Sequence, residues 1–328
     1  MKLLRHTIAA AAIIVGLDTA APAAFAQTQP KFPSKPVRLI VGFSPGSASD
    51  ITARTVAPRL SELWGQPVVI ENRSGAGSTI ASATVAQATP DGHTLLVITT
   101  SFAITSVLQQ KNLPYDALKD FRGVTQFGST TGALTVSPAL GVKSARDFIA
   151  LARERPGKIL YGSAGAGSGL HMSTERFNMI AGIKAVHVGF KGQPELILEV
   201  VAGRIHYGLP GLGSAMPFIK DGRMLALAVN TPKRSPILPD VPALVEILPK
   251  FERDAAHGLL APARTPRALV HQISKDVARA LEHPDVKERM QAISFDIAPT
   301  TPEEYDRIIR NQIEIFSTVA KAAGLIAK

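Results

Sequence analysis

Short apolar runs alternate with longer amphipathic segments along most of the chain. An apolar run of four to eight residues is typical of a buried strand, and strands that alternate with helices form βα units with mostly parallel sheets. The sequence therefore predicts an α/β protein. Strands are predicted at 37–41, 68–71, 94–99, 158–161, 185–188, 205–209 and 225–229. Helices are predicted at 50–63, 79–87, 144–153, 173–181, 194–202, 267–282, 284–292 and 302–323.

The first residues resemble an export signal rather than part of the fold. Lys2 and Arg5 precede an apolar run at 7–17, and the small-residue site A-F-A follows at 24–26. This order is typical of a cleavable secretory signal, and the run is too short to span a bilayer. We therefore expect a signal peptide at 1–26 and a soluble periplasmic protein.

The remaining chain, about 300 residues, is long enough for two ordinary domains. The whole chain has 36 basic and 26 acidic residues, an excess of positive charge that favours an anionic partner. Nucleic acid is not expected, because the basic residues are scattered and no aromatic residues interleave with them for base stacking. The chain has no cysteine, which excludes disulfides and thiolate metal sites.

Two segments read as crossings between domains. One lies near 122–129, and the other is the proline-rich segment NTPKRSPILPDVP at 230–242, which can continue neither a helix nor a central strand. If the chain leaves one domain at the first crossing and returns at the second, the first domain is discontinuous. We expect lobe 1 at 27–125 and 233–328, lobe 2 at 126–232, and a hinge at the crossings.

Residues 42–46 read GFSPG, the G-x-S-x-G pattern of a serine hydrolase, between a predicted strand and a predicted helix. A secreted hydrolase that uses Ser44 is therefore one hypothesis. In such an elbow the residue after the serine donates its backbone N–H to the oxyanion. Here that residue is Pro45, which has no N–H, so the hydrolase hypothesis is disfavoured.

The same turn favours binding of an anion. Gly46 can adopt a positive φ, Ser47 can cap the helix, and Asp50 falls in its first turn. A helix N-terminus presents unpaired N–H groups and the positive end of the helix dipole. Three further turns carry hydroxyl residues ahead of a helix, two of them with glycines as well, and we expect all four to line one cleft: TTSFAITS from Thr99, YGSAGAGSGLHMS from Tyr161 and YGLPGLGSA from Tyr207.

Two alternative sites fit the sequence poorly. The glycines of AGAGSG, at 165, 167 and 169, are spaced G-x-G-x-G rather than G-x-G-x-x-G, and the next strand offers His187 instead of an acid. The histidines include no H-x-x-x-H pair that would bind zinc on a helix. We therefore expect neither a cofactor nor a metal.

From residue 32 onward the chain resembles the Bug receptors, periplasmic solute-binding proteins related to the TctC component of tripartite tricarboxylate transporters. The resemblance implies a Venus-flytrap fold of the periplasmic binding protein type II class, with two βα lobes and a ligand cleft between them. It also implies a small carboxylate ligand, such as a dicarboxylate or an aromatic acid, held by main-chain amides and hydroxyls. The expected partners are integral-membrane transporter subunits or a sensor protein. The matching segments are FPSKPVRLIVGFSPGSASDITAR, GQPVVIENRSGAGSTIASATVAQATPDGHTLL, LPYDALKDF, ILPDVPALVE and GLLAPARTP.

The chain departs from the family pattern at four places that bear on the ligand. Ser47 replaces a glycine, Phe190 a frequent tyrosine, and His206 a common aspartate, while no aromatic residue stands at 256–257, where the chain has Ala256 and His257. We expect His206 to be a packed or hydrogen-bonded histidine rather than a ligand contact. The residues expected to contact the ligand are Phe43, Ser44, Gly46, Ser47, Ala48, Asp50, Thr100, Ser101, Ser163, Ala166, Gly167, Ser168, His171, Phe190, Leu209 and Pro210.

Overall fold

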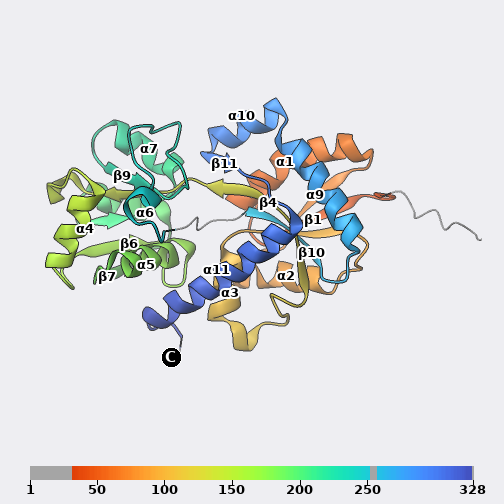
Figure 1. The fold of residues 1–328 in the computed structure, drawn as a ribbon, viewed down its shortest axis with the longest axis horizontal. Coiled ribbons are helices and arrows are strands. Elements are labelled where there is room, and N and C mark those ends of the chain that lie inside the picture. The colour runs from red at the N-terminus through yellow and green to blue at the C-terminus, as the bar shows by residue number, and fades with distance from the viewer. Residues whose placement is uncertain (1–31, 252–256, 327–328) are drawn as a thin grey trace, which may run out of the picture. The chain divides into compact units, whose positions relative to one another are not determined.

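The computed structural model of the protein describes residues 32–251 and 257–326. Phe32–Lys328 form one compact unit, which holds two separate β-sheets with helices packed around each (Figure 1). We call the elements around the first sheet the first lobe and those around the second sheet the second lobe. The predicted signal peptide, at 1–26, lies outside the described residues.

The first sheet has six strands in the order β11-β4-β10-β3-β1-β2. Its strand β1 pairs in parallel with β2 and β3, whereas β10 runs antiparallel to β3 and β4, and β11 runs antiparallel to β4. The bounds are β1 Val37–Val41, β2 Val68–Asn72, β3 Thr94–Ile98, β4 Phe121–Thr130, β10 His257–Pro262 and β11 Phe295–Ile297.

The second sheet has five strands in the order β7-β6-β8-β5-β9. Strand β6 pairs in parallel with β7 and β8, and β5 runs antiparallel to β8 and β9. The bounds are β5 Ala133–Val136, β6 Leu160–Ser163, β7 Val186–Gly189, β8 Tyr207–Gly208 and β9 Leu225–Val229.

The α/β class is confirmed, but the expectation of mostly parallel sheets is wrong. The antiparallel pairs come from strands that the sequence patterns did not reveal, β4, β5, β10 and β11. Strands β4 and β5 flank the first passage of the chain between the sheets and β10 follows the second, whereas β11 lies between α10 and α11. A strand that enters a sheet from the other lobe, rather than through a βα crossover on the same sheet, is free to run antiparallel.

Strand β1 shows why the first lobe needs helices on both sheet faces. Leu39 and Val41 pack into one apolar cluster with residues of helices α1, α9 and α10. Ile40, between them, packs on the opposite face with residues of α2, α3 and α11. Successive side chains of a strand point to opposite faces, so a strand with buried apolar residues on both faces is covered on both.

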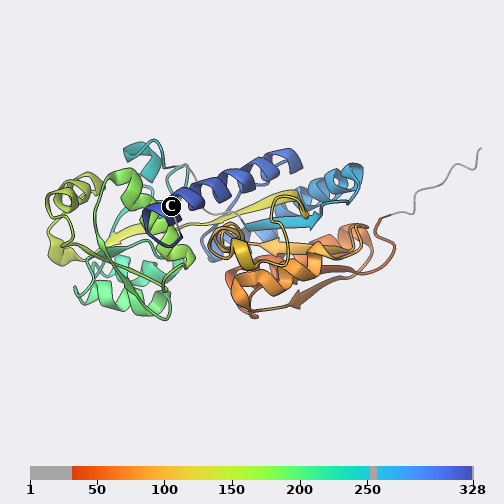
Figure 2. The ribbon, with the colours of Figure 1, turned by 90° about the horizontal axis from the view of Figure 1, so that it is seen from below.

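The helices occupy the predicted segments, with three additions, α3, α7 and α8. The start of α5 is also earlier than predicted, at Gly169 rather than residue 173. Helix α11 packs against α3 and β4 of the first lobe and against α5 of the second (Figure 2). The bounds are α1 Ala48–Trp64, α2 Thr79–Ala86, α3 Ser101–Leu108, α4 Ala145–Glu154, α5 Gly169–Ala181, α6 Gln193–Val201, α7 Leu212–Lys220, α8 Leu244–Ile247, α9 Arg267–Leu281, α10 Pro284–Ala292 and α11 Pro302–Ala322.

Two crossings link the sheets. The first is short, because β4 ends at Thr130 and β5 begins at Ala133. The second runs from the end of β9 to the start of β10 and includes the proline-rich segment. The crossings are hydrogen bonded to each other, since Gly132 N–H donates to Asn230 Oδ1 at 2.7 Å and Asn230 N–H donates to Gly132 O at 2.9 Å. The exact division into 27–125 with 233–328 and 126–232 stays a prediction.

Candidate ligand-binding cleft

A cavity of about 390 Å³ is lined by elements of both lobes. The turns that lead into helices α1, α3, α5 and α7 line much of this cavity. The other lining residues come from the crossings and from α5, α6 and β10. The lining residues are Phe43, Ser47, Ala48, Ser49, Thr99, Thr100, Ser101, Thr130, Thr131, Gly132, Ala164, Ser168, Gly169, Leu170, Ser173, Gln193, Leu209, Gly211, Asn230 and His257.

Helices α1 and α5 present equivalent N-termini to this cleft. Ser47 caps α1 by accepting a hydrogen bond from the backbone N–H three residues later, and Ser168 caps α5 in the same way. The first two residues of each helix line the cleft, Ala48 and Ser49 in α1, Gly169 and Leu170 in α5. The N–H groups at these positions have no acceptor within a helix. The cleft therefore receives two pairs of backbone donors and two positive dipole ends.

The glycines before these caps have backbone conformations that suit the turns. Gly46 has φ of +81° and Gly167 has φ of +74°, as the turns require. Their N–H groups, however, point back to side chains of the following helix. Gly46 N–H donates to Asp50 Oδ2 at 2.9 Å, and Gly167 N–H donates to His171 Nδ1 at 2.9 Å. Asp50 and His171 thus hold the turns and do not line the cleft.

Asp50 is buried, yet its carboxyl stays ionised. Burial alone would raise its pKa, but hydrogen bonds from Arg54, Gly46 N–H and Asn72 outweigh burial and hold the pKa below its ordinary value. Arg54 Nε lies 3.0 Å from both carboxylate oxygens, and Asn72 Nδ2 lies 2.9 Å from Oδ1. The first-lobe turn therefore rests on a carboxylate that is charged throughout the neutral pH range.

Two amide side chains add further donors. Gln193 Oε1 accepts Gly211 N–H at 2.9 Å, and Asn230 Oδ1 accepts Gly132 N–H at 2.7 Å. Because each amide oxygen is fixed by a backbone donor, the NH₂ group is the end left for a ligand. Sequence reasoning missed both residues. No local signal was present, since Gly211 and Gly132, whose N–H groups these amides accept, lie 18 and 98 residues away in the chain.

His257, at the start of β10, is a buried cleft residue that sequence reasoning treated only as a departure from a family. Its Nε2 lies 3.5 Å from Thr130 Oγ1, its ring meets Phe295 edge-on at 5.3 Å, and its Nδ1 has no hydrogen-bond partner. Burial lowers the pKa of His257 to about 4, so the side chain is neutral at pH 7.

His257 should make the protein sensitive to acid. A histidine in the unfolded chain has a pKa of about 6.5. As the pH falls from 6.5 toward 4, His257 therefore binds a proton in the unfolded state but not in the folded state, which destabilises the folded state. This residue alone should cost about 2 kcal/mol of unfolding free energy between pH 7 and pH 5. His257→Phe, which keeps a ring beside Phe295, should reduce the loss by that amount in urea titrations at both pH values. His271→Gln changes a histidine outside the cleft. An equal reduction of the stability loss in this variant would contradict the assignment of the loss to His257.

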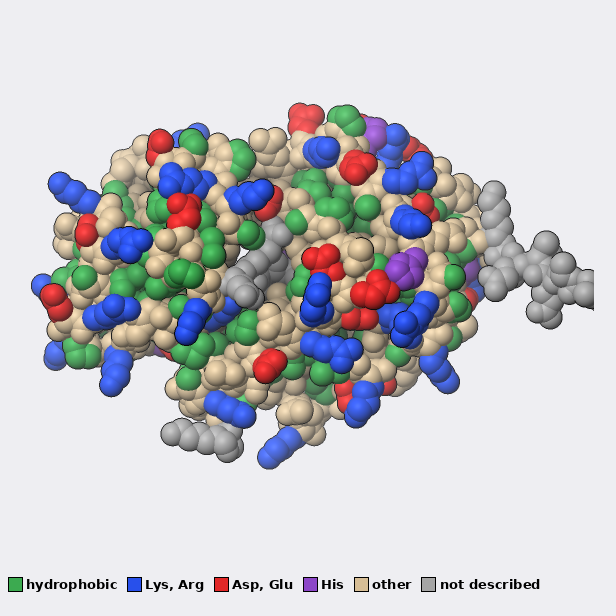
Figure 3. All heavy atoms as spheres, in the orientation of Figure 1, with side chains coloured by type: hydrophobic (Ala, Val, Ile, Leu, Met, Phe, Trp, Pro, Cys, Tyr) green, Lys and Arg blue, Asp and Glu red, His purple; other side chains and the backbone are tan. Residues whose placement is uncertain are grey.

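None of the described residues that line the cleft is an Asp, Glu, Lys or Arg. The excess of basic residues is carried elsewhere, and on the face seen in Figure 3 the Lys and Arg side chains are spread among Asp and Glu. The cleft can therefore hold an anion only through neutral donors and helix dipoles. It offers no carboxylate to a ligand's ammonium group.

The structure brings together seven of the sixteen residues predicted to contact the ligand. Phe43, Ser47, Ala48, Thr100, Ser101, Ser168 and Leu209 line the cleft. Nine others do not line it, and their contacts with a ligand stay predictions: Ser44, Gly46, Asp50, Ser163, Ala166, Gly167, His171, Phe190 and Pro210. His206 is hydrogen bonded as expected, since its Nδ1 accepts Leu160 N–H at 2.8 Å.

Ser44 does not have the surroundings of a nucleophile. Its side chain is exposed, and its Oγ lies 3.4 Å from Ser74 Oγ. The next residue is Pro45, so this turn lacks the backbone donor of an oxyanion hole. In the described part of the chain, no group of three or more acidic, histidine or cysteine side chains is placed to hold a metal, and no helix is long and apolar enough to cross a membrane.

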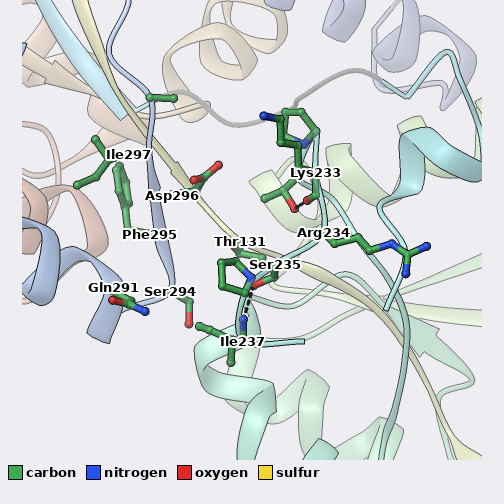
Figure 4. A pocket seen from close by; sticks show the side chains of 14 residues that line it. Thr131, Lys233, Arg234, Ser235, Ile237, Gln291, Ser294, Phe295, Asp296 and Ile297 are labelled. Carbon is green, nitrogen blue, oxygen red and sulfur yellow. Dashed lines mark hydrogen bonds between the residues drawn. The ribbon is translucent and has the colours of Figure 1, made fainter. Parts of the chain in front are cut away.

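A larger cavity, about 520 Å³, lies at the crossings (Figure 4). It is lined by residues 231–237 of the proline-rich segment and by residues 294–298 around β11, with Thr131 shared between this cavity and the cleft. No residue predicted to contact the ligand lines it, and no helix N-terminus of the kind found at α1 or α5 opens into it. The cleft is therefore the better candidate site.

Known proteins resemble this chain over most of its length. The family described as "Tripartite tricarboxylate transporter family receptor" (TctC) matches residues 52–325. Protein BugT of Bordetella pertussis is 28% identical over 295 residues, which are 89% of this chain and 90% of BugT. An R. palustris protein solved with adipate is 33% identical, with a TM-score of 0.71 over 89% of this chain and 98% of its own. MatC of Rhodopseudomonas palustris, solved with bound malate, is 29% identical, with a TM-score of 0.67 over 88% of this chain and 99% of its own.

Proposed function

Because the chain belongs to the TctC family of tripartite tricarboxylate transporter receptors, we propose that it captures a small organic carboxylate in the cleft between its lobes and performs no chemistry on it. We further propose that the signal at 1–26 directs it to the periplasm. There the lobes close around the ligand, and the complex is presented to integral-membrane transporter subunits or to a sensor protein.

The paired helix N-termini are the observation that carries this proposal. Ala48 and Ser49, the first two residues of α1, line the cleft from one lobe, and Gly169 and Leu170, the first two of α5, line it from the other. Helix N-termini bind carboxylates as well as phosphates. Because both lobes supply such donors, a carboxylate held between them favours the closed arrangement of the lobes over the open one.

The rest of the lining narrows the ligand class. The amide hydrogens of Gln193 and Asn230 add donors, while Phe43, Leu170 and Leu209 add apolar surface. A ligand with an ammonium group would leave that cation without a carboxylate partner, which is costly in a buried site. The cleft thus favours dicarboxylates and aromatic acids over amino acids. Relatives of this chain solved with adipate and malate support the same class.

A panel of ligands tests the proposal. Adipate, malate and benzoate each carry a carboxylate, adipamide replaces both carboxylates with neutral amides, and 2-aminoadipate adds an ammonium group. We expect at least one of the acids to raise the melting temperature, because a ligand at about 100 times its Kd adds about 2.7 kcal/mol to stability. In calorimetric titrations, adipamide and 2-aminoadipate should each bind at least tenfold more weakly than adipate.

Two results would contradict the proposal. Equal stabilisation by adipate and adipamide would show that the cleft does not recognise the charge. Turnover of a generic ester that is abolished in Ser44→Ala would favour the hydrolase instead.

A further inference from the structure

The two turns that shape the cleft are held by different chemical groups. In the first lobe a carboxylate, Asp50, accepts the N–H of Gly46, and in the second lobe an imidazole, His171, accepts the N–H of Gly167. Both acceptors stand three residues after the capping serine, and both are almost fully buried, with 2% and 4% of their surface exposed. The positions are equivalent, but only the imidazole titrates near neutral pH.

His171 must be unprotonated at Nδ1 to make this bond. A neutral imidazole has one donor nitrogen and one acceptor nitrogen, and the Gly167 N–H requires Nδ1 to be the acceptor. Protonation would convert Nδ1 into a second donor facing the amide hydrogen. The turn would then lose its hydrogen bond and gain a repulsive contact.

A second histidine is stacked on the first. The ring of His187 lies 3.9 Å from that of His171, with 20° between their planes, and its Nε2 lies 2.6 Å from Ser163 Oγ. Ser163 Oγ also accepts Gly165 N–H at 3.1 Å, so both histidines support the same loop, residues 163–169. Two stacked rings at this distance cannot both carry a charge without strong repulsion.

The surroundings of the pair offer little to stabilise a proton. Tyr161 of β6 stacks near both rings, with Tyr207 of β8 behind it. Glu175, one turn along α5, favours protonation of His187, but it already accepts a hydrogen bond from Tyr161. Arg176 lies over Phe251. Beside the pair, Met172 of α5 packs in an apolar cluster with residues of α3 and α11: Ala103, Ile104, Val107, Leu108, Ile313, Ile315, Phe316, Val319 and Ala320.

We propose that His171 is a positioning residue that holds the second-lobe turn only while its imidazole is neutral, so that the protein releases its anionic ligand in mild acid. The proposal rests on the proposed function for its ligand, but not for the behaviour of the turn. Burial lowers the pKa of both histidines, and a charge on His171 lowers the pKa of His187 further. The turn is therefore intact at pH 7 and is lost as the pH falls below 6.5 and through the pKa of His171.

The first test needs no ligand. In ¹⁵N-labelled protein, the amide signal of Gly167 should shift as His171 titrates, whereas the Gly46 amide, bonded to Asp50, should stay constant over the same pH range. In His171→Asn the amide oxygen can accept the Gly167 N–H, because an Asn side chain is as long as the Asp50 side chain that does so in the first lobe. This variant should abolish the pH-dependent shift of the Gly167 amide signal. A Gly167 amide that is constant in the wild type, or that titrates unchanged in His171→Asn, overturns the proposal.

The second test measures affinity for whichever acid of the ligand panel binds. If only the neutral form binds, affinity should fall about tenfold for each pH unit below the pKa of His171. His171→Asn should bind with an affinity that changes less than about twofold over that range, and His171→Ala should bind weakly at every pH. His206→Asn is the matched control, because His206 Nδ1 also accepts a backbone N–H, from Leu160, away from the turn. It should keep the wild-type pH dependence.

These outcomes separate the two proposals. A Gly167 titration without binding of any acid in the panel would contradict the proposed function and leave the role of His171 in the turn intact. Binding whose pH dependence persists in His171→Asn would contradict acid release through this residue, while the receptor function would stand.

Discussion

Ser168→Asp should weaken carboxylate binding at least a thousandfold, about 4 kcal/mol, without unfolding the protein. Aspartate caps a helix as well as serine does, so it can still accept the His171 N–H that Ser168 Oγ accepts at 3.2 Å. Its charge, however, would stand at the N-terminus of α5 in the cleft, where the ligand's carboxylate is expected. Like charges at such close range cost several kcal/mol.

Ser144→Asp provides the matched control. Ser144 caps α4 through the same bond, accepting Asp147 N–H at 3.1 Å, and it does not line the cleft. Calorimetric titration of both variants, with urea unfolding as the check on folding, isolates the effect of charge in the cleft. Equal affinities for the two variants would place the ligand's carboxylate away from α5.

Gly258→Ala should destabilise the protein by about 4 kcal/mol, an exceptional loss for one methyl group. A Cβ at this position in β10 would lie 2.4 Å from the backbone oxygen of Thr125 and 2.4 Å from Tyr305 Oη. The first contact is with a paired strand and cannot relax by a change of rotamer. Tyr305, a residue of α11, is fully buried, so its side chain cannot shift to relieve the second contact.

Urea unfolding measures the loss, with Gly192→Ala as the control. Gly192 has an extended backbone, and the nearest atom to its Cβ would be Pro194 Cδ at 3.6 Å, an ordinary contact. We expect the control to cost about 1 kcal/mol or less. Equal costs at the two positions would show that β10 and β4 can separate to admit a methyl group.

The sequence predicted the turns of the cleft because their signals are local. A glycine, a capping serine and an acceptor three residues later stand within five positions at 46–50, and a positive φ needs no information from elsewhere in the chain. The direction of the Gly46 N–H was not predictable in the same way. It depends on Asp50 being buried against Asn72 and Arg54, which is a tertiary arrangement.

The strands and cleft residues that were missed depend on contacts between distant segments. Strand β4 includes five polar residues and two glycines in ten positions, and it becomes a strand by pairing with β10 and β11 from the far end of the chain. Thr131, Asn230 and His257 reach the cleft because the crossings and β10 meet there. No pattern within a short window contains that information.

The hydrogen bonds between Gly132 and Asn230 extend the pairing of β5 with β9. Gly132 and Asn230 exchange backbone and side-chain bonds, and next to them Ala133 of β5 pairs with Val229 of β9. Leu244 and Phe251, which follow Asn230 in the chain, pack in the apolar cluster of the second lobe. The bonds therefore tie the end of the first crossing to the edge of the second sheet and fix where the chain enters that lobe.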